Sequence, residues 1–393
     1  MRRAAAATGA ALGLLLLAGC VAPPQPKPKL TLEPVPFASL RGWDQDHVAA
    51  AIPPLLKSCA RRLAQPPTAA VGPHGLAGTV AQWRAPCAAA SAIPPGDDGA
   101  ARRFFMRWFT PVLAGNNGEP RGLFTGYYEP LLDGARAAGG ADATQILRRP
   151  PDLVMVALGL FRPEWRGDHI AGRVVKGRLV PYPTRAEIER GGAIDRRKLA
   201  LFWVSDPVDA FFLEIQGSGK IRLADGTLAS VGYDGQNGRP YVAIGRLLVQ
   251  RGVLTRDQVS LATIKAWIEA HPAQGRALMD ENPSYVFFRE VKGDTPIGAE
   301  GAVLTPERSL AVDRAYLPLG IPVWLDLDNA GTPLRRLVIA QDTGGAIRGP
   351  VRGDFYWGFG PAAEQAAGAM KAHGRYFLFL PKGVAGAVPP AAS

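Results

Sequence analysis

Short apolar runs rich in β-branched and aromatic residues recur along the chain, and clusters of Gly, Pro, Asn and Asp separate them. This pattern is typical of β-strands joined by tight turns. Residues 131–243 differ from the rest in their many Gly- and Ala-rich loops, so we expect them to form an inserted all-β domain. We expect strands at 123–129, around 172–182, 200–204, 210–216 and 220–230, and at 285–290, 321–327, 337–341 and 375–380.

Apolar residues at helical spacing predict a few peripheral helices. The pair Pro53-Pro54 interrupts the first such pattern, so we expect two short helices there. Another helix is expected to begin at Thr255, which forms a capping-box pattern with Gln258, and to end at 271. With a helix at 241–250, it should return the chain to the first domain. That domain then comprises 39–130 and 244–383, with further helices at about 98–112 and at 361–374.

The first 19 residues have the pattern of a signal peptide, because Arg2 and Arg3 precede a short apolar run. The run Leu17-Ala-Gly-Cys20 resembles the cleavage site of bacterial lipoproteins, which predicts a lipidated Cys20 at the mature N-terminus. Since Val21 rather than Asp follows, we expect an outer-membrane lipoprotein facing the periplasm; a soluble secreted or periplasmic protein is the alternative. Prolines predict an extended linker over 20–38, and 384–393 is expected to be a flexible tail.

Composition and charge narrow the class of protein. With 393 residues the chain is long enough for two domains, and its 46 Gly and 36 Pro favour a turn-rich β protein over a helical bundle. The formal net charge is +11, but the basic residues are dispersed, so nucleic acid is not an expected partner. An anionic surface or polymer fits this charge, and plain solubility fits it equally well.

Cysteine and histidine usage argues against several kinds of site. Cys59 and Cys87 are the only cysteines after Cys20, and in an exported protein we expect a disulfide between them; two buried thiols are the alternative. The five histidines lack zinc-binding spacing, and no Gly-x-Ser-x-Gly elbow is present. The run 216–220, Gln-Gly-Ser-Gly-Lys, lacks the spacing of a phosphate loop and is interpreted as a hairpin turn. We expect no metal and no cofactor.

Two aspartates stand where packing does not require a carboxylate. Asp342 follows an apolar run and precedes a Gly-Gly turn, and Asp354 lies between Gly353 and the aromatic run 355–357. Apolar neighbours raise the pKa of a carboxyl group, so Asp354 is a candidate general acid. Either aspartate alone also fits an ordinary surface turn. A Ca²⁺ or Mg²⁺ site is disfavoured, because Gly and apolar residues rather than further acids follow each aspartate.

The spacing of the aspartates changes this assessment. Three segments, with the patterns AVDxxxLPLG, AxDTGGAIRG and RGDFYWG, resemble the three-aspartate (3D) domain of the membrane-bound lytic transglycosylase A family, over 304–382. The segments 125–130, 211–219, 233–241 and 282–288 resemble the other signatures of this family. The resemblance implies a mainly β fold, a six-stranded double-psi β-barrel with the insertion 131–243 as a second β-barrel-like domain. It also implies a glycan groove between the two domains.

The resemblance implies a reaction as well. Lytic transglycosylases cleave the β-1,4 bond between N-acetylmuramic acid and N-acetylglucosamine in peptidoglycan and leave 1,6-anhydromuramyl ends. Asp354 would protonate the glycosidic oxygen and then accept the proton of the muramyl C6 hydroxyl as it attacks C1. Asp342 and Asp313 would stay ionised and place the sugar, although Asp313 is also compatible with a turn that organises its Pro-Leu-Gly loop. Other substrate-binding or supporting candidates are Thr125, Tyr127, Tyr128, Glu129, Gln216, Ser218, Gly344 and Gly345.

Two other functions fit the same residues. One is an inverting glycoside hydrolase in which Asp342 or Glu129 activates water. The other is a non-catalytic lipoprotein that binds peptidoglycan. The expected partners are peptidoglycan glycan strands, the outer membrane through the lipid anchor, and complexes of cell-wall synthesis or division. The positive end of a helix beginning at Pro361 would lower the pKa of a nearby carboxyl group, so the direction of the pKa shift of Asp354 stays open at this point.

Overall fold

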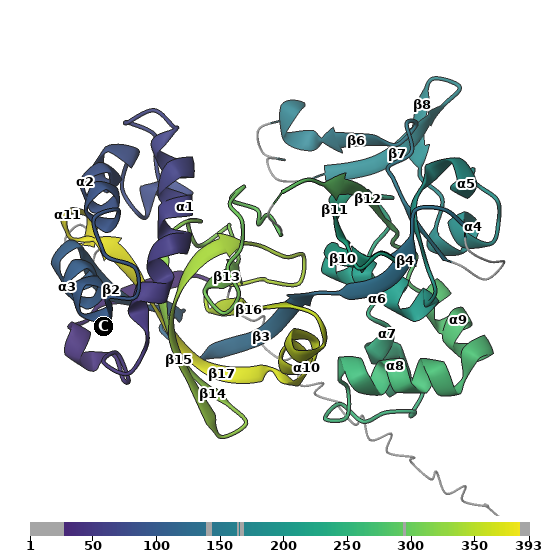
Figure 1. Cartoon of the computed structure of the whole chain (residues 1–393). Coiled ribbons are helices and arrows are strands. Elements are labelled where there is room, and N and C mark those ends of the chain that lie inside the picture. Colours follow the sequence, from purple (N-terminus) through teal and green to yellow (C-terminus); the bar gives the residue numbers. More distant parts are fainter. Residues whose placement is uncertain (1–26, 139–143, 163–164, 166–168, 294–295, 386–393) are drawn as a thin grey trace, which may run out of the picture.

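The chain folds into two bodies and passes between them twice (Figure 1). The computed structural model describes residues 27–138, 144–162, 165, 169–293 and 296–385. The predicted signal peptide, Cys20, the first part of the linker and most of the predicted tail lie outside these residues. No helix within the described ranges is long and apolar enough to cross a membrane. The fold is mainly β, as the pattern predicts, with helices packed against the sheets.

Six strands of the first body pair in a closed ring. The order is β3, β17, β14, β15, β13, β16 and back to β3. The pairings of β13 with β15 and of β16 with β3 are parallel, and the other four are antiparallel. The sheet continues from β17 to β2 (Phe109–Asn116) and β1 (Leu30–Pro34). The ring strands are β3 (Gly122–Glu129), β13 (Ser309–Val312), β14 (Pro322–Asn329), β15 (Thr332–Asp342), β16 (Arg352–Phe359) and β17 (Lys371–Pro381).

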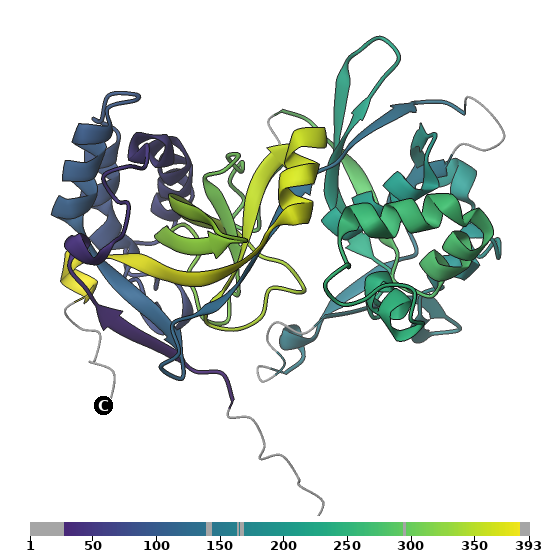
Figure 2. The same ribbon diagram turned by 90° about the horizontal axis from the view of Figure 1, so that it is seen from below.

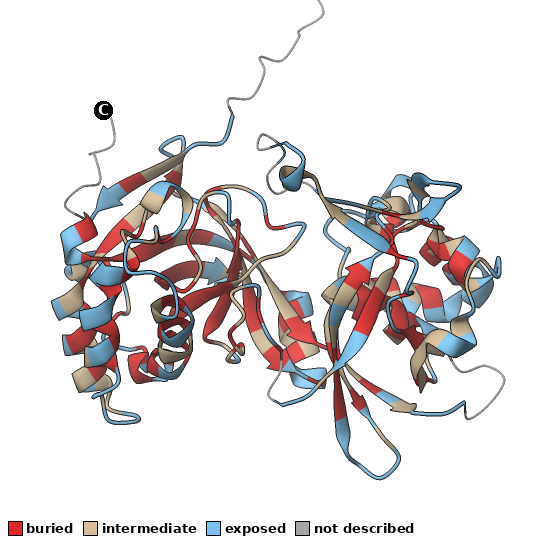
Figure 3. Ribbon diagram, turned by 90° about the horizontal axis from the view of Figure 1, so that it is seen from above, coloured by how far each residue is buried: buried red, intermediate tan, exposed pale blue. Residues whose placement is uncertain are grey.

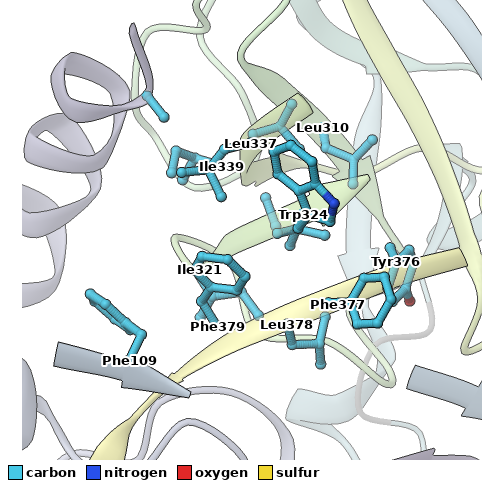
Figure 4. Close-up of a cluster of buried hydrophobic side chains, with 14 of the residues drawn as sticks. Phe109, Leu310, Ile321, Trp324, Leu337, Ile339, Tyr376, Phe377, Leu378 and Phe379 are labelled. Carbon is cyan, nitrogen blue, oxygen red and sulfur yellow. The ribbon is translucent and has the colours of Figure 1, made fainter. Parts of the chain in front are cut away.

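Apolar side chains cover the ring strands on both faces. Successive side chains of a strand point to opposite faces, so the uninterrupted burial of residues 322–327 in β14 means that both faces are covered. Trp324 is fully buried, and its ring centroid lies 5.3 Å from that of Trp43. Figure 4 shows Trp324 with Phe379 and other residues of this core. In Figure 3 buried residues run along the strands of both bodies.

Three helices of the N-terminal region pack on the first body. They are α1 (Ile52–Leu63), α2 (Val80–Ala90) and α3 (Asp98–Trp108). Pro53-Pro54 lies in the first turn of α1, where no intrahelical N–H bond is lost, and a 3-10 helix (Val48–Ala51) precedes it. The predicted disulfide joins α1 to α2 through Cys59 and Cys87. It therefore fastens two helices that cover one side of the ring.

Two boundaries in this region differ from the prediction. The linker predicted over 20–38 is wrong for residues 30–34, which form β1 and pair with β2 while Leu32 is buried. The helix predicted to run to residue 112 ends at Trp108, and β2 begins with Phe109. Pro111 explains this end, because a proline inside a helix removes a hydrogen bond and clashes with the preceding turn.

The second body contains a six-stranded sheet and a smaller three-stranded sheet. The order of the larger sheet is β12, β11, β10, β4, β9, β5, and that of the smaller one is β6, β7, β8. The bounds are β4 (Leu131–Ala135), β5 (Thr144–Leu147), β6 (Val154–Ala157), β7 (His169–Val175), β8 (Arg178–Pro181), β9 (Ala200–Val204), β10 (Ser218–Arg222), β11 (Leu228–Gln236) and β12 (Val286–Val291).

The insertion is not all-β, because the strand predicted at 210–216 is a helix, α6 (Pro207–Gln216). Its start signal outweighs the β-branched and aromatic composition: the Asp206 side chain accepts a hydrogen bond from Val208 N at 2.7 Å, and Pro207 occupies the first helical position. Gly217 ends the helix with φ 78°, a left-handed conformation suited to glycine. The predicted hairpin turn at 216–220 is therefore a helix end followed by β10. Short helices α4 (Arg185–Glu189) and α5 (Arg196–Leu199) also belong to this body.

The helices after residue 243 stay with the second body (Figure 2), contrary to the prediction that they return the chain to the first. Side chains of α7, α8 and α9 share one apolar cluster with Phe211 and Phe212 of α6, and β12 then completes the large sheet. The predicted start at Thr255 is also wrong, because the capping box forms at Ser260. The bounds are α7 (Ile244–Gln250), α8 (Leu261–Ala270) and α9 (Pro272–Asp280).

Two ion pairs tie the bodies together beside the β3–β4 connection. Lys265 of α8 donates to Glu364 of α10 (Pro361–Ala369) at 2.6 Å. Lys220 of β10 lies 3.7 Å from the carboxylate of Glu129, the last residue of β3. α10 begins at Pro361 as predicted but ends before residue 374, because β17 already starts at Lys371. The second body is thus held against the end of β3 and against α10.

Candidate active site

Strand register brings Asp342 and Asp354 into one row across neighbouring strands of the ring. Asp342 of β15 and Asp354 of β16 are both paired with Ala311 of β13, and Asp354 is paired with Thr125 of β3. Directly paired residues point to the same face of a sheet. The row therefore presents Asp342, Asp354 and Thr125 side by side, although they lie in three segments of the sequence.

Asp354 is held by a short chain of hydrogen bonds. Arg352 Nη2 donates to Thr125 Oγ1 at 2.8 Å, and the Thr125 hydroxyl donates to Asp354 Oδ1 at 2.5 Å. Burial raises the pKa of Asp354 to about 6, and repulsion by Asp342 acts in the same direction. The Thr125 hydrogen bond and the charge of Arg352 lower this pKa and offset part of the effect. Asp354 can therefore carry a proton under mildly acidic to near-neutral conditions.

Of the aromatic run 355–357 expected to line Asp354, only Tyr356 lies on its face, and Tyr127 of β3 joins it. Because side chains alternate along β16, Tyr356 shares the face of Asp354, and its ring centroid lies 5.2 Å from that of Tyr127. Phe355 points the other way, into the core. Trp357 packs over Gly126, where any Cβ would come within 2.6 Å of the indole Nε1. The Gly in Thr-Gly-Tyr thus allows β3 and Trp357 to approach closely.

Asp342 is fixed by donors on both of its oxygens. Ala299 N donates to Oδ1 at 2.9 Å, and the Tyr127 hydroxyl donates to Oδ2 at 2.9 Å. Burial raises the pKa of Asp342, and these hydrogen bonds act against the rise. Burial, with the charges of Asp342 and Asp354, raises the pKa of Tyr127 well above its usual range, so this phenol stays a donor. Tyr127 thus donates to Asp342 and lies in the field of Asp354.

Asp313 is buried and organises loops at the edge of the row. Its Oδ1 accepts a hydrogen bond from Ala315 N at 3.0 Å, and its Oδ2 accepts one from Gly349 N at 2.7 Å. These contacts join the loop after β13 to the loop between β15 and β16. Gly344 and Gly345 belong to the second of these loops, and a side chain added at Gly345 would meet open space. Asp313 is thus placed as a loop organiser.

Two other candidates from β3 lie beyond the aspartate row. Tyr128 is buried against Ala363 and Ala367 of α10, so it is part of the packing. Glu129 is fully buried, and burial raises its pKa to about 7 against the opposing charge of Lys220. Helix α10 begins at this end of β16, where Gly360 N donates to the carbonyl of Glu129 at 3.2 Å. Its positive end is therefore aimed near Glu129 and away from Asp354.

Gln216 and Ser218 belong to the second body, at the end of α6 and the start of β10. Within the described ranges, neither forms a hydrogen bond to Asp342 or Asp354. Lys220, two residues further along β10, reaches Glu129. The insertion thus approaches the ring through Lys220, a residue that the sequence motif did not single out.

The sequence analysis did not predict two residues that contact the row, Arg352 and Ala299. Arg352 was visible as the first residue of the third aspartate motif, and its charge next to Asp354 was an available signal. The backbone donor Ala299 had no such signal, because its position depends on a loop between β12 and β13. Among the described residues, no three His, Cys, Asp or Glu side chains gather to hold a metal ion. The row therefore consists of two carboxyl groups, Asp342 and Asp354, with hydrogen-bond donors beside them.

Comparison with known proteins shows what the chain resembles. The model described as the MltA specific insert domain matches residues 123–289, and the 3D domain model matches residues 308–380. Membrane-bound lytic murein transglycosylase A of Vibrio cholerae is 34% identical over 292 residues, 72% of this chain and 71% of that protein. A crystal structure of MltA from Neisseria gonorrhoeae is 35% identical, with a TM-score of 0.75 and coverage of 89% of this chain and 92% of that chain. The crystal structure of Escherichia coli MltA with bound chitohexaose is 27% identical, with a TM-score of 0.66 and coverage of 89% and 94%.

Proposed function

The chain belongs to the membrane-bound lytic murein transglycosylase A family, and from this premise we infer that it is a peptidoglycan lytic transglycosylase. Such an enzyme is a lyase that cleaves the glycan strand between N-acetylmuramic acid and N-acetylglucosamine. It leaves a 1,6-anhydro ring in place of a reducing end. Chitohexaose bound to the Escherichia coli relative supports a glycan strand as the ligand of this chain.

Asp354 is the proposed acid and base of the reaction, and its raised pKa in the ordered aspartate row is the observation that carries the assignment. Thr125 occupies Oδ1, and within the described residues no group donates to Oδ2, so Oδ2 can hold the proton. The neutral acid protonates the glycosidic oxygen as the bond to muramyl C1 breaks. The resulting carboxylate then accepts the proton of the C6 hydroxyl.

The C6 hydroxyl closes the ring because it is already part of the reacting sugar. An intramolecular nucleophile has an effective concentration of about 10⁵ M or more, which exceeds that of water. One carboxyl group suffices for this sequence, since it gives a proton in the first half and receives one in the second. No water molecule enters the balance of the reaction.

Asp342 is proposed as a positioning acid whose charge also favours the protonated form of Asp354. Tyr127 and Tyr356 supply aromatic surface beside the row, suited to the apolar side of a sugar ring. Asp313 supports the loop that carries Gly344 and Gly345, which we propose as a backbone-lined edge of the glycan site. Gln216 and Ser218 are proposed to contact the strand further along, from the second body.

We propose further that the strand ring is a double-psi β-barrel and that the glycan lies where the two bodies meet. The closed order of six strands with two parallel pairings supports the first point. The position of the aspartate row on β3, the strand that leads into the second body, supports the second.

The family name indicates association with a membrane, and we propose that Cys20 supplies the anchor in the outer membrane. Residues 21–29 would then connect this anchor to β1 and leave the enzyme facing the periplasm. Palmitate labelling of the wild-type chain and of Cys20→Ala tests this anchor. Equal labelling of both would contradict it.

An inverting hydrolase is the competing enzyme, and the geometry of the two possible bases disfavours it. Glu129 lies four residues beyond Thr125 on β3, about 13 Å along the strand, whereas inverting carboxyl pairs are about 6.5–9.5 Å apart. Asp342 has both oxygens engaged by protein donors. Neither residue is arranged to activate a water molecule for attack.

Product analysis tests the reaction directly. Sacculi are digested with the chain from Val21 onward, which retains every described residue, and half of the sample is reduced with borohydride. Anhydromuramyl ends are one water lighter than hydrolysed ends and gain no hydrogen. Products that gain two hydrogens on reduction would identify a hydrolase. Murein binding without any released fragment would identify a non-catalytic binding protein.

A further inference from the structure

A second charged site lies on the first body, outside the aspartate row. It is a cavity of about 240 Å³, and its charged lining consists of Arg41, Arg121, Arg335, Arg375, Asp326 and Asp328. Four guanidinium groups against two carboxylates leave an excess of two positive charges. The catalytic proposal uses none of these residues.

Asp326 is the centre of this arrangement. Its side chain is only 1% exposed, and it accepts hydrogen bonds from three arginines. Arg41 donates through Nε and Nη2 at 2.9–3.0 Å, Arg375 Nη2 donates at 2.9 Å, and Arg335 Nε donates at 3.2 Å. The register explains the convergence, because Asp326 of β14 is paired with Arg335 of β15 and with Arg375 of β17. The N-terminal segment adds Arg41 from above the sheet.

The single carboxylate of Asp326 accepts hydrogen bonds from only some of the N–H groups of the three arginines. Each guanidinium carries five N–H donors, so the three groups have roughly fifteen, and the hydrogen bonds to Asp326 engage only a minority. Asp326 instead fixes the guanidinium planes and limits their rotamers. Such pre-organised forks match the oxygens of a phosphate or carboxylate group.

Arg121 also lines the cavity, but unlike the other three arginines it is not bonded to Asp326. Its guanidinium forms no hydrogen bond or ion pair with any residue that the structure describes. The partners of Asp326 are Arg41, Arg335 and Arg375, so Arg121 takes no part in neutralising it. Arg121 is exposed to solvent, so its guanidinium is free to contact a negative ligand that enters the cavity beside the three fixed arginines.

We propose that this cavity binds an oxyanion, with a phosphate group as the best-matched class. Arg121 and the outward donors of Arg375 and Arg335 would hold its oxygens, and Asp326 would hold the arginines in place. The phosphate can belong to a lipid headgroup or to a free or polymer-bound phosphate. This site does not depend on the glycan reaction, and it gives the dispersed positive charge of the chain one specific point of contact.

Phosphate binding is tested with the chain from Val21 onward. The melting temperature is measured against sodium phosphate, with sodium chloride at equal ionic strength as the reference, and titration calorimetry gives the affinity. We expect a saturable rise that chloride does not reproduce. Arg121→Gln should weaken phosphate binding about tenfold or more, since one charge-assisted hydrogen bond is lost. Arg84→Gln, an exposed arginine of α2, removes the same charge elsewhere and should leave the affinity unchanged.

Two further measurements distinguish a binding site from a purely structural ion cluster. Asp326→Asn releases the guanidinium planes that the carboxylate fixes, so it should lower stability and also weaken phosphate binding. Arg121→Gln should fold normally and cleave murein like the wild type. The proposal would be overturned if phosphate had no saturable effect on the wild type. It would also be overturned if Arg121→Gln and Arg84→Gln showed equal phosphate affinity.

The source of the phosphate is decided with vesicles. Flotation with phosphatidylglycerol–phosphatidylethanolamine vesicles is compared with flotation with phosphatidylcholine vesicles. Binding to the anionic vesicles that Arg121→Gln abolishes and Arg84→Gln preserves would identify a lipid headgroup. Arg121-dependent binding of inorganic phosphate without vesicle binding would identify a free or polymer-bound phosphate.

Discussion

Replacing Asp354 with Asn should stabilise the protein while it removes activity. Asp354 is half-buried, and this burial raises its pKa to about 6 in the folded state against 3.8 for the ordinary group. Each pKa unit corresponds to ~1.36 kcal/mol, so ionised Asp354 destabilises the folded state by about 3 kcal/mol at neutral pH. Asn remains neutral, and its amide oxygen can still accept the Thr125 hydroxyl. The free energy of unfolding of the variant should therefore be about 3 kcal/mol higher than that of the wild type at neutral pH.

The sign of this effect depends on pH. Between about pH 4 and 6 the folded protein binds more protons at Asp354 than the unfolded chain does, so wild-type stability falls as the pH rises. Below about pH 4 both states are protonated, and the advantage of Asp354→Asn should vanish. Above about pH 6 the advantage should be complete.

Denaturant unfolding of both proteins across this pH range measures the difference. Murein cleavage, measured in parallel, should fall by about 10²- to 10⁴-fold in Asp354→Asn, as expected when a general acid is lost. Asp44→Asn, at an exposed position, is the matched control and should change neither property much. A stability difference that does not depend on pH would refute the pKa reasoning, and near wild-type cleavage would refute the catalytic assignment.

Three further predictions concern the surroundings of Asp354. Asp342→Asn removes a repulsive charge, so the pKa of Asp354 should fall; the basic limb of the pH–activity profile should move to lower pH, with a smaller loss of activity than in Asp354→Asn. Thr125→Val removes a hydrogen bond to the carboxylate and should move the same limb to higher pH; an unmoved limb would exclude this contact from setting the pKa. Cys59→Ser with Cys87→Ser should cost about 3 kcal/mol of stability and leave murein cleavage intact below the melting temperature, and thiol labelling of the denatured wild type should find neither cysteine free.

The aspartate row could be anticipated from sequence only in part. The motif spacing predicted Asp342 and Asp354 as candidate site residues. Their common pairing partner Ala311 and the contact with Thr125 depend on strand order around the ring. A single sequence does not specify which strands become neighbours when the pairings join distant segments. The donor Ala299 illustrates the same limit.

The misassigned elements have local and non-local causes. The pair Asp206-Pro207 is a helix start signal that is present in the sequence. The apolar run that follows it suits a strand equally well, so the sequence pattern left α6 ambiguous. The placement of α7 to α9 had no local signal, because it is determined by apolar contacts with α6. The aromatic run after Asp354 was assigned correctly as a wall, but strand alternation selects Tyr356 for that role.

Strand β3 has a mechanical consequence, because it joins the two bodies. It carries Thr125 and Tyr127 in the first body and leads through Pro130 directly into β4 of the second. An extended strand scarcely lengthens, so any displacement of the second body would act along β3 on the position of the Thr125 hydroxyl. Displacing that hydroxyl from Asp354 Oδ1, now 2.5 Å away, would strengthen the hold of the carboxyl group on its proton.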